Sequence, residues 1–230
     1  MTTVSYIIAP PAIPALPVAG SDALFPVRRV YCIGRNYAAH AIEMGHDPDR
    51  EPPFFFQKNP NNLDASGVFP YPSRSSDVHH EIELAVALKS GGRDISPSNA
   101  LDHVFGYAVA LDMTRRDRQA EAKKAGRPWD IAKAFEHSAP IGPIQSAETV
   151  GHPSEGLIRL KVNGEQRQSG NLNQMIWKIP EMIAHLSDYF KLAAGDVILT
   201  GTPSGVGPVQ QGDTLEASID GLPPLTVSVI

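Results

Sequence analysis

Two glutamates separated by one residue form the pair most able to do chemistry in this chain of 230 residues. Glu81 and Glu83 lie in VHHEIELAVAL, residues 78–88, whose apolar and polar residues alternate over its first half as in a β-strand. Side chains two apart on a strand share a face and lie about 7 Å apart along it, so these carboxylates repel each other unless a cation lies between them. The neighbouring Ile82 and Leu84 indicate a buried strand, where unpaired charge is costly.

A third carboxylate, Asp112, ends a second apolar run, residues 104–111. Three carboxylates without a thiolate suit Mg²⁺ or Mn²⁺ better than Zn²⁺. The alternative is that E-x-E marks an exposed edge strand and that Asp112 is an ordinary turn residue. His79 and His80 face opposite ways on a strand and cannot easily share one zinc ion, so we expect one to support the site and the other to pack.

His40 and Glu43 are three residues apart in a predicted short helix, residues 37–44. On a helix they share a face, so the carboxylate can orient the imidazole and stabilise its charged form. Such a pair suits a general base near neutral pH, although an ordinary solvated surface pair has the same spacing.

Three cations are candidates for binding an anion, and each could equally be a surface charge: Arg35 in a turn, Arg116 after Asp112, and Lys133 among apolar residues. The glycine-rich stretch TGTPSGVG, residues 200–207, could place backbone N–H groups around a carboxylate or phosphate. It lacks the lysine of a P-loop and no obvious helix follows it, which argues against nucleotide binding.

The elements that would position these residues are mostly short strands. Strands are predicted at residues 29–33, 54–57, 78–88, 104–111, 157–162, 197–200, 214–219 and 225–230, and helices at 37–44, 115–124 and 179–190. Residues 1–27 form a proline-punctuated arm, with one short strand predicted at Val4–Ile8. Many short strands with little helix favour a rolled or barrel-like β architecture over alternating βαβ units.

Composition indicates one globular domain, with 42% apolar and 20% charged residues. The formal charge of −5 and the lack of a long basic run argue against nucleic-acid binding. The N-terminal apolar residues are interrupted by prolines and lack a basic region, so we expect neither a signal peptide nor a membrane span. Cys32 is the only cysteine, which excludes an intramolecular disulfide and suggests a cytoplasmic protein with a buried, inert thiol.

Five ordered motifs carry a family resemblance: CIGRNYAAHAIEM (32–44), HHEIELAVAL (79–88), GYAVALDMTRRDRQ (106–119), GRPWDIAKAFEHSAPIGP (126–143) and ILTGTPSGVGPV (198–209). Together they resemble the fumarylacetoacetate hydrolase family over residues 28–230, the expected catalytic domain, with residues 1–27 as an N-terminal arm. The resemblance implies an α+β, β-rich mixed β-roll with few short helices, usually a homodimer.

The resemblance also implies the centre of the reaction. Glu81, Glu83 and Asp112 would bind Mg²⁺ or Mn²⁺, in agreement with the strand argument. His40 and Glu43 would form the base dyad, on a segment that orders over the substrate.

The same resemblance implies the groups around the substrate. Arg116, Gln119 and Lys133 would line the pocket, with Lys133 and Gln119 as candidates to stabilise an oxyanion. Thr202 would hold the substrate carboxylate, and Arg35 matches the arginine of the GRNY motif.

Within the family, the chain looks most like members that hydrolyse fumarylpyruvate to fumarate and pyruvate in gentisate catabolism. Three stretches carry this: GHDPDREPPFFFQK (45–58), FPYP (69–72) and GNLNQMIWKIPEMIAHLS (170–187). The stretch KNPNN, residues 58–62, departs from the family pattern, so the resemblance does not predict the structure of the pocket wall near Lys58. Arg50 is predicted to meet the far carboxylate of the substrate, unless it pairs with Asp47 or Asp49.

The predicted activity is therefore that of a hydrolase acting on carbon–carbon bonds of 2,4-dioxo acids. The alternatives are an oxaloacetate decarboxylase, an isomerase or decarboxylase of homoprotocatechuate degradation, and a non-catalytic dicarboxylate-binding protein. Family members with the same ligands differ in reaction, so the motifs alone leave these open.

Overall fold

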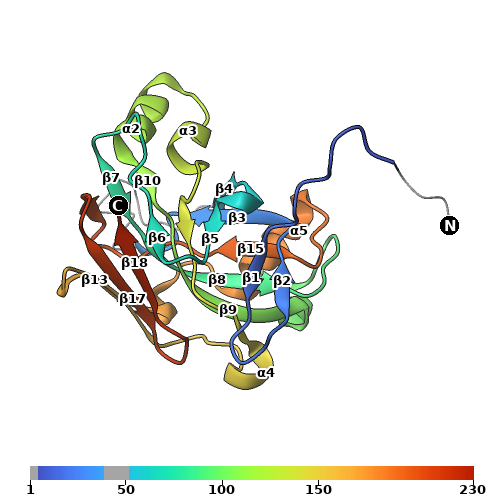
Figure 1. Ribbon diagram of the computed structural model, residues 1–230. Coiled ribbons are helices and arrows are strands. Elements are labelled where there is room, and N and C mark those ends of the chain that lie inside the picture. The colour runs from blue at the N-terminus through green and yellow to red at the C-terminus, as the bar shows by residue number, and fades with distance from the viewer. Residues whose placement is uncertain (1–4, 39–51) are drawn as a thin grey trace.

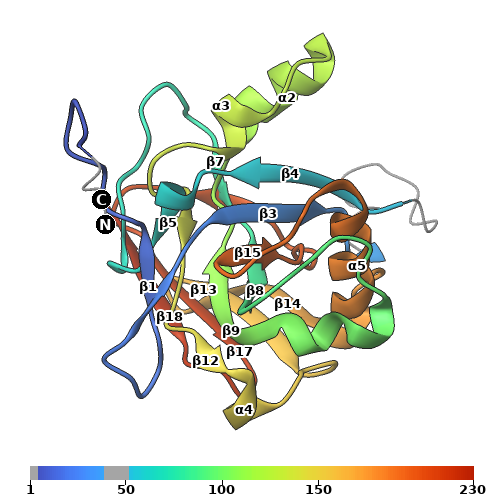
Figure 2. The same ribbon diagram turned by 90° about the vertical axis from the view of Figure 1, so that its right-hand side faces the viewer.

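The computed structural model describes residues 5–38 and 52–230. In this part of the chain strands dominate and the α-helices are few and short, which confirms the predicted α+β, β-rich fold class. Helices α2 and α3 lie together at one end of the molecule and α4 at the other (Figure 1, Figure 2).

A six-stranded sheet forms the centre of the fold. Its order is β12 (Gln145–Ser146), β9 (Val104–Leu111), β8 (Ile82–Leu88), β15 (Asp196–Leu199), β3 (Arg29–Gly34) and β4 (Phe54–Lys58). Only the β15–β3 pair is parallel. Both faces are buried, because Tyr31 and Ile33 belong to one apolar cluster while Val30 and Cys32 belong to the other.

A five-stranded sheet packs against one of these faces. Its order is β14 (Glu165–Asn171), β13 (Leu157–Val162), β17 (Thr214–Ile219), β18 (Leu225–Val229) and β6 (Val68–Phe69). In β17, Leu215, Ala217 and Ile219 are buried while Glu216 and Ser218 are exposed, as expected for a sheet with one face in the core. The inward side chains join those of the six-stranded sheet in the main core.

A three-stranded sheet continues three strands of the six-stranded sheet past an interruption. It consists of β10 (Thr114–Arg115), β7 (Val78–His80) and β16 (Gly207–Val209), and its order, β10-β7-β16, repeats the order β9-β8-β15. The interruptions are Glu81 between β7 and β8, Asp112 and Met113 between β9 and β10, and residues 200–206 between β15 and β16. We call this level of the fold the sheet junction.

Two small sheets cover the remaining edges: β1 (Ala15–Pro17) with β2 (Leu24–Pro26), and β5 (Leu63–Asp64) with β11 (Ala139–Pro140). The first differs from the irregular arm predicted for this region, because Leu16 and Phe25 bury against the second face of the six-stranded sheet. The strand predicted at Val4–Ile8 is absent from its described residues, 5–8, which are exposed.

The helices pack at the periphery. They are α2 (Arg116–Ala125), α3 (Asp130–Lys133), α4 (Ala147–Val150) and α5 (Ile179–Tyr189), with 3₁₀ turns at Pro60–Asn62, Pro97–His103 and Leu172–Gln174. Helix α5 buries Ile179, Met182, Ile183 and Leu186, the spacing of one apolar helix face. Among the described residues, no helix combines the length and apolarity needed to cross a membrane.

Candidate active site

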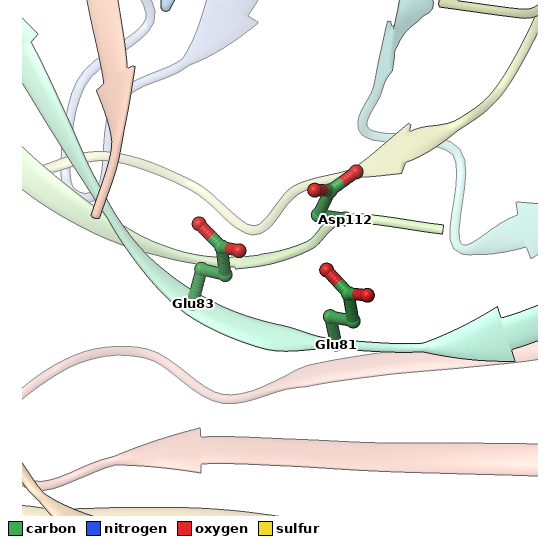
Figure 3. A group of neighbouring side chains, drawn as sticks. All are labelled: Glu81, Glu83 and Asp112. Carbon is green, nitrogen blue, oxygen red and sulfur yellow. The ribbon is translucent and has the colours of Figure 1, made fainter. Parts of the chain in front are cut away.

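The three predicted carboxylates meet at the sheet junction. Glu81 and Glu83 share a strand face with Ala85 and Ala87, while the intervening residues point into the main core. The backbone N–H of Asp112 donates to the carbonyl of Glu81 (2.8 Å), which sets Asp112 beside the glutamates. Figure 3 shows the three side chains pointing toward one another.

The geometry of these carboxylates fits a hard divalent cation. One oxygen from each of Glu81, Glu83 and Asp112 lies within 4.8 Å of the others, and all three residues are buried. Oxygens around Mg²⁺ lie about 3–4 Å apart, given metal–oxygen distances near 2.1 Å, so a small side-chain movement would bring them onto one ion. Asp112 Oδ1 is buried and accepts no hydrogen bond within the described chain, although the Lys58 ammonium lies 2.9 Å from it.

The electrostatics of Glu83 favour a cation as well. Burial raises the pKa of the Glu83 carboxyl group well above its usual range, and the negative charges of Asp112 and Glu81 raise it further. Its Oε2 accepts a hydrogen bond from the backbone N–H of Gly201 (2.8 Å). A divalent ion between the carboxylates would offset their repulsion and favour the ionised form of Glu83.

Two buried lysines pair with Asp112. Lys133 Nζ donates to Asp112 Oδ2 (2.6 Å) and to Glu81 Oε2 (2.8 Å). Burial lowers the pKa of Lys133, but the charges of Asp112 and Glu81 outweigh burial and hold that pKa above the usual range, so Lys133 stays an ammonium. Lys58 Nζ lies 2.9 Å from Asp112 Oδ1 in an ion pair whose angles fall outside hydrogen-bond geometry.

Helix α2 brings an arginine and an amide to the same place. Arg116 Nη2 donates to Glu81 Oε1 (2.5 Å), and Arg116 Nη1 donates to Gln119 Oε1 (2.6 Å). Positions i and i+3 share a helix face, which explains why these two side chains meet. Because the carbonyl oxygen of Gln119 is occupied by Arg116, its amide NH₂ is the group left to donate to a ligand.

The glycine-rich stretch folds into a turn that presents Thr202. Gly201 has φ +92°, and a Cβ there would lie 2.8 Å from Cβ of Asn36, so this position requires glycine. Gln168 Nε2 donates to Thr202 Oγ1 (2.8 Å). Since Thr202 Oγ1 already accepts this bond, its hydroxyl proton is free to be donated to a ligand.

Eight predicted site residues therefore line one pocket: Arg35, Glu81, Glu83, Asp112, Arg116, Gln119, Lys133 and Thr202. Their roles stay predictions. His40, Glu43 and Arg50 lie outside the described residues. Of the two histidines, His80 is buried with Nδ1 3.0 Å from Gln168 Oε1, and His79 pairs with Asp77 (2.8 Å). Cys32 is buried, and burial raises the pKa of its thiol.

The Fumarylacetoacetate (FAA) hydrolase C-terminal family matches residues 29–230. The chain belongs to this family. A crystal structure of fumarylpyruvate hydrolase from Pseudomonas aeruginosa in complex with Mn²⁺ and pyruvate is 51% identical in sequence, with a TM-score of 0.96 over 98% of this chain and 99% of that one.

Relatives with other named activities are similar to nearly the same degree. Oxaloacetate tautomerase YcgM of Escherichia coli is 46% identical over 198 residues, 86% of this chain and 90% of the relative. The mitochondrial oxaloacetate decarboxylase of Dictyostelium discoideum is 42% identical over 197 residues, 85% of this chain and 90% of the relative. The comparisons thus show membership of the fumarylacetoacetate hydrolase family, in which relatives at 42–51% identity carry different named activities.

The structure adds two residues to this site that the sequence did not single out for a role. Lys58 contacts Asp112, Met113, Lys133 and Ser138 through its ammonium group. Gln168 bridges the turn and strand β8, because its Oε1 accepts from the N–H of Ile82 (3.0 Å) while its Nε2 donates to Thr202. The sequence offered only weak signals for these two residues. Gln168 lies in a polar stretch, and Lys58 follows the Phe triplet.

Proposed function

We propose that this chain hydrolyses the carbon–carbon bond between C3 and C4 of a 2,4-dioxo acid, with fumarylpyruvate as substrate and fumarate and pyruvate as products. The observation that carries the proposal is the cluster of three buried carboxylates facing Lys133, Arg116 and Gln119 in one pocket. The similarity to a fumarylpyruvate hydrolase in complex with Mn²⁺ and pyruvate supports it.

The charges of the pocket support an anionic substrate. The negative charges of the three carboxylates are matched by the positive charges of Lys58, Lys133 and Arg116, each of which contacts at least one of them. A bound Mg²⁺ or Mn²⁺ adds two positive charges to this buried cluster. Arg35 and Lys123 line the same pocket, so the loaded site carries an excess of positive charge, which favours an anionic ligand over a neutral compound.

Glu81, Glu83 and Asp112 would hold the ion through oxygen atoms. A divalent ion bound there would supply Lewis acidity, withdrawing electron density from the 1-carboxylate and 2-oxo group of the substrate. Thr202 would orient the 1-carboxylate through its hydroxyl proton. Lys133 Nζ and the Gln119 amide would donate to the oxygen of the C4 carbonyl as negative charge develops on it.

His40, oriented by Glu43, would take a proton from water, and the resulting hydroxide would add to C4. The C3–C4 bond then breaks, and its electron pair passes to C3 of the pyruvate fragment. C3 takes up one proton and C4 becomes the new carboxylate of fumarate. One water molecule is consumed, so the atoms balance.

A second candidate is oxaloacetate chemistry, favoured by the 46% identity to an oxaloacetate tautomerase. Tautomerisation moves one proton between carbon and oxygen and needs no attacking water. Decarboxylation releases CO₂ and needs no base to activate water. Both would use the same carboxylates and the same binding of the 1-carboxylate and 2-oxo group.

The deciding experiment measures four reactions with one Mg²⁺- or Mn²⁺-loaded preparation. Two are the release of pyruvate from fumarylpyruvate and from acetylpyruvate, and two are the tautomerisation and the decarboxylation of oxaloacetate. We expect fumarylpyruvate to have the highest kcat/KM, and a chelator to abolish its hydrolysis. Turnover of oxaloacetate without hydrolysis of either dioxo acid would reject the proposal.

We propose a homodimer for its assembly, on the family resemblance, and a cytoplasmic location, on the single buried Cys32. Some relatives are named as mitochondrial proteins. Size-exclusion chromatography with light scattering would test the assembly.

A further inference from the structure

Two cations lie on an aromatic wall of the pocket. The rings of Phe54 and Trp129 meet edge to face, with centroids 5.0 Å apart. The Arg35 guanidinium lies 5.5 Å from the centre of the Phe54 ring, and Lys123 Nζ lies 5.2 Å from the centre of the Trp129 ring. All four residues line the same pocket as the three carboxylates. We call Arg35 and Lys123 the cationic rim.

The cationic rim differs from the other cations of the pocket in its partners. Lys133 and Arg116 are committed to Glu81 or Asp112. Neither Arg35 nor Lys123 forms an ion pair with a carboxylate in the chain from residue 5 to 38 and 52 to 230. Aromatic faces attract cations but do not neutralise them. No carboxylate of the described residues neutralises the rim either, so its positive charge can attract an anionic ligand.

The positive charges of Arg35 and Lys123 also lie close enough to repel each other. Burial lowers the pKa of Lys123, and the charges of Arg116 and Arg35 lower it further. An anion held between Lys123 and Arg35 would relieve this repulsion.

The backbone at Arg35 adopts an unusual conformation next to an anchored residue. It has φ +58°, in the left-handed region that a residue with a long side chain rarely adopts. The next residue, Asn36, is anchored by hydrogen bonds from its Nδ2 to the carbonyl of Thr200 (2.8 Å) and from the N–H of Trp177 to its Oδ1 (2.7 Å). Strained backbone conformations cluster at binding sites, so a binding role for Arg35 would account for this strain.

We propose that Lys123 and Arg35 bind the second carboxylate of a dicarboxylic 2-oxo acid, which makes them the residues that select dicarboxylates; this rests on the proposed function. The 1-carboxylate and 2-oxo group would bind near the divalent ion that Glu81, Glu83 and Asp112 would hold. The second carboxylate of fumarylpyruvate lies at C7, beyond the 4-oxo group and a planar double bond. Phe54 and Trp129 pack against that planar segment, and the cationic rim supplies the charge-assisted hydrogen bonds that the far carboxylate needs.

The kinetic test compares Lys123→Met with Lys124→Met. Lys123 and Lys124 are both exposed lysines of α2, but only Lys123 lines the pocket, so the control repeats the chemical change outside the site. For Lys123→Met we expect KM for fumarylpyruvate to rise about tenfold, as for loss of one charge-assisted hydrogen bond from an exposed lysine at the pocket. KM for acetylpyruvate, which has no second carboxylate, should stay within about twofold, and Lys124→Met should match the wild type for both.

A binding test does not depend on turnover. Titration calorimetry of the Mg²⁺-loaded protein would compare 2-oxoheptanedioate with 2-oxoheptanoate, which differ only in the far carboxylate and lack the 4-oxo group needed for cleavage. The wild type should prefer the dicarboxylate, and Lys123→Met should lose about tenfold of that preference.

The outcomes separate this inference from the proposed function. If the wild type releases no pyruvate but Lys123→Met still loses the dicarboxylate preference, the rim stands and the proposed hydrolysis falls. The inference is overturned if Lys123→Met changes KM for both substrates equally and the affinity for both ligands equally, or changes none of these values. In that case the rim does not bind the second carboxylate.

Discussion

Replacing Lys58 with methionine would remove a charge from the centre of the sheet junction while keeping most of the side-chain volume. The Lys58 side chain is fully buried. Its Nζ lies 2.9 Å from Asp112 Oδ1, donates to Ser138 Oγ (3.0 Å), and donates to the carbonyls of Met113 (3.4 Å) and Lys133. One ammonium thus holds the strand end that carries Asp112 and the backbone that carries Lys133.

The expected cost follows from these contacts. Breaking a buried ion pair by removing one partner costs about 3–5 kcal/mol, because the remaining charge is left uncompensated. Asp112 keeps Lys133 as a second partner, so we expect the lower end, about 3 kcal/mol. For a chain of this size that loss lowers the melting temperature by roughly 6–12 °C, at about 2–4 °C per kcal/mol.

The assay is urea unfolding in buffer free of divalent ions, followed by circular dichroism. Lys161→Met is the matched control, because Lys161 is an exposed lysine on strand β13 and its replacement should change the free energy of unfolding by less than about 0.5 kcal/mol. A loss below about 1 kcal/mol for Lys58→Met, relative to this control, would refute the view that Lys58 holds the junction together.

Three further predictions concern the ion, the base and the turn. Glu83→Gln should abolish Mn²⁺ binding in calorimetry with the fold intact, whereas Glu216→Gln, the same change at an exposed strand position, should leave the affinity unchanged; retained affinity in Glu83→Gln would contradict the ligand assignment. His40→Ala should lower hydrolysis about 10²–10⁴-fold without altering Mn²⁺ affinity, and activity within threefold of wild type would mean that another group activates water. Gln168→Leu should lower the melting temperature and raise KM, because it removes the buried bonds that hold the turn with Thr202, while Gln166→Leu, exposed on the same strand, should do neither.

The apolar strands of the centre were predictable because their sequences alternate or run apolar between turn residues. The predictions at residues 29–33 and 104–111 agree with β3 and β9 to within one residue. The polar strand β14 was not predicted, since along most of its length it lies at a sheet edge and buries only Gln168. Edge strands need few apolar residues, so their sequences carry little periodic signal.

The candidate site was predictable to the extent that neighbours in sequence determine it. Strand geometry alone predicts that Glu81 and Glu83 share a face. In the structure their side chains do point to the same side (Figure 3). Lys58 and Gln168 could not be found in this way, because their partners lie 34 or more residues away in the chain. A buried lysine next to a Phe triplet has no periodicity that distinguishes it from a surface lysine.

The sheet junction explains why three carboxylates can be placed together in a buried part of the fold. Where β7, β10 and β16 leave the line of β8, β9 and β15, the strands are interrupted at Glu81, at Asp112 and Met113, and over residues 200–206, although the N–H of Asp112 still donates to the carbonyl of Glu81. In the turn of residues 200–206, backbone groups that have no strand partner become available to side chains and ligands. The Gly201 N–H that donates to Glu83, and the turn that presents Thr202, are groups of this kind. A continuous sheet would have used them in its own ladder, so in this fold the site lies where the strands change sheets.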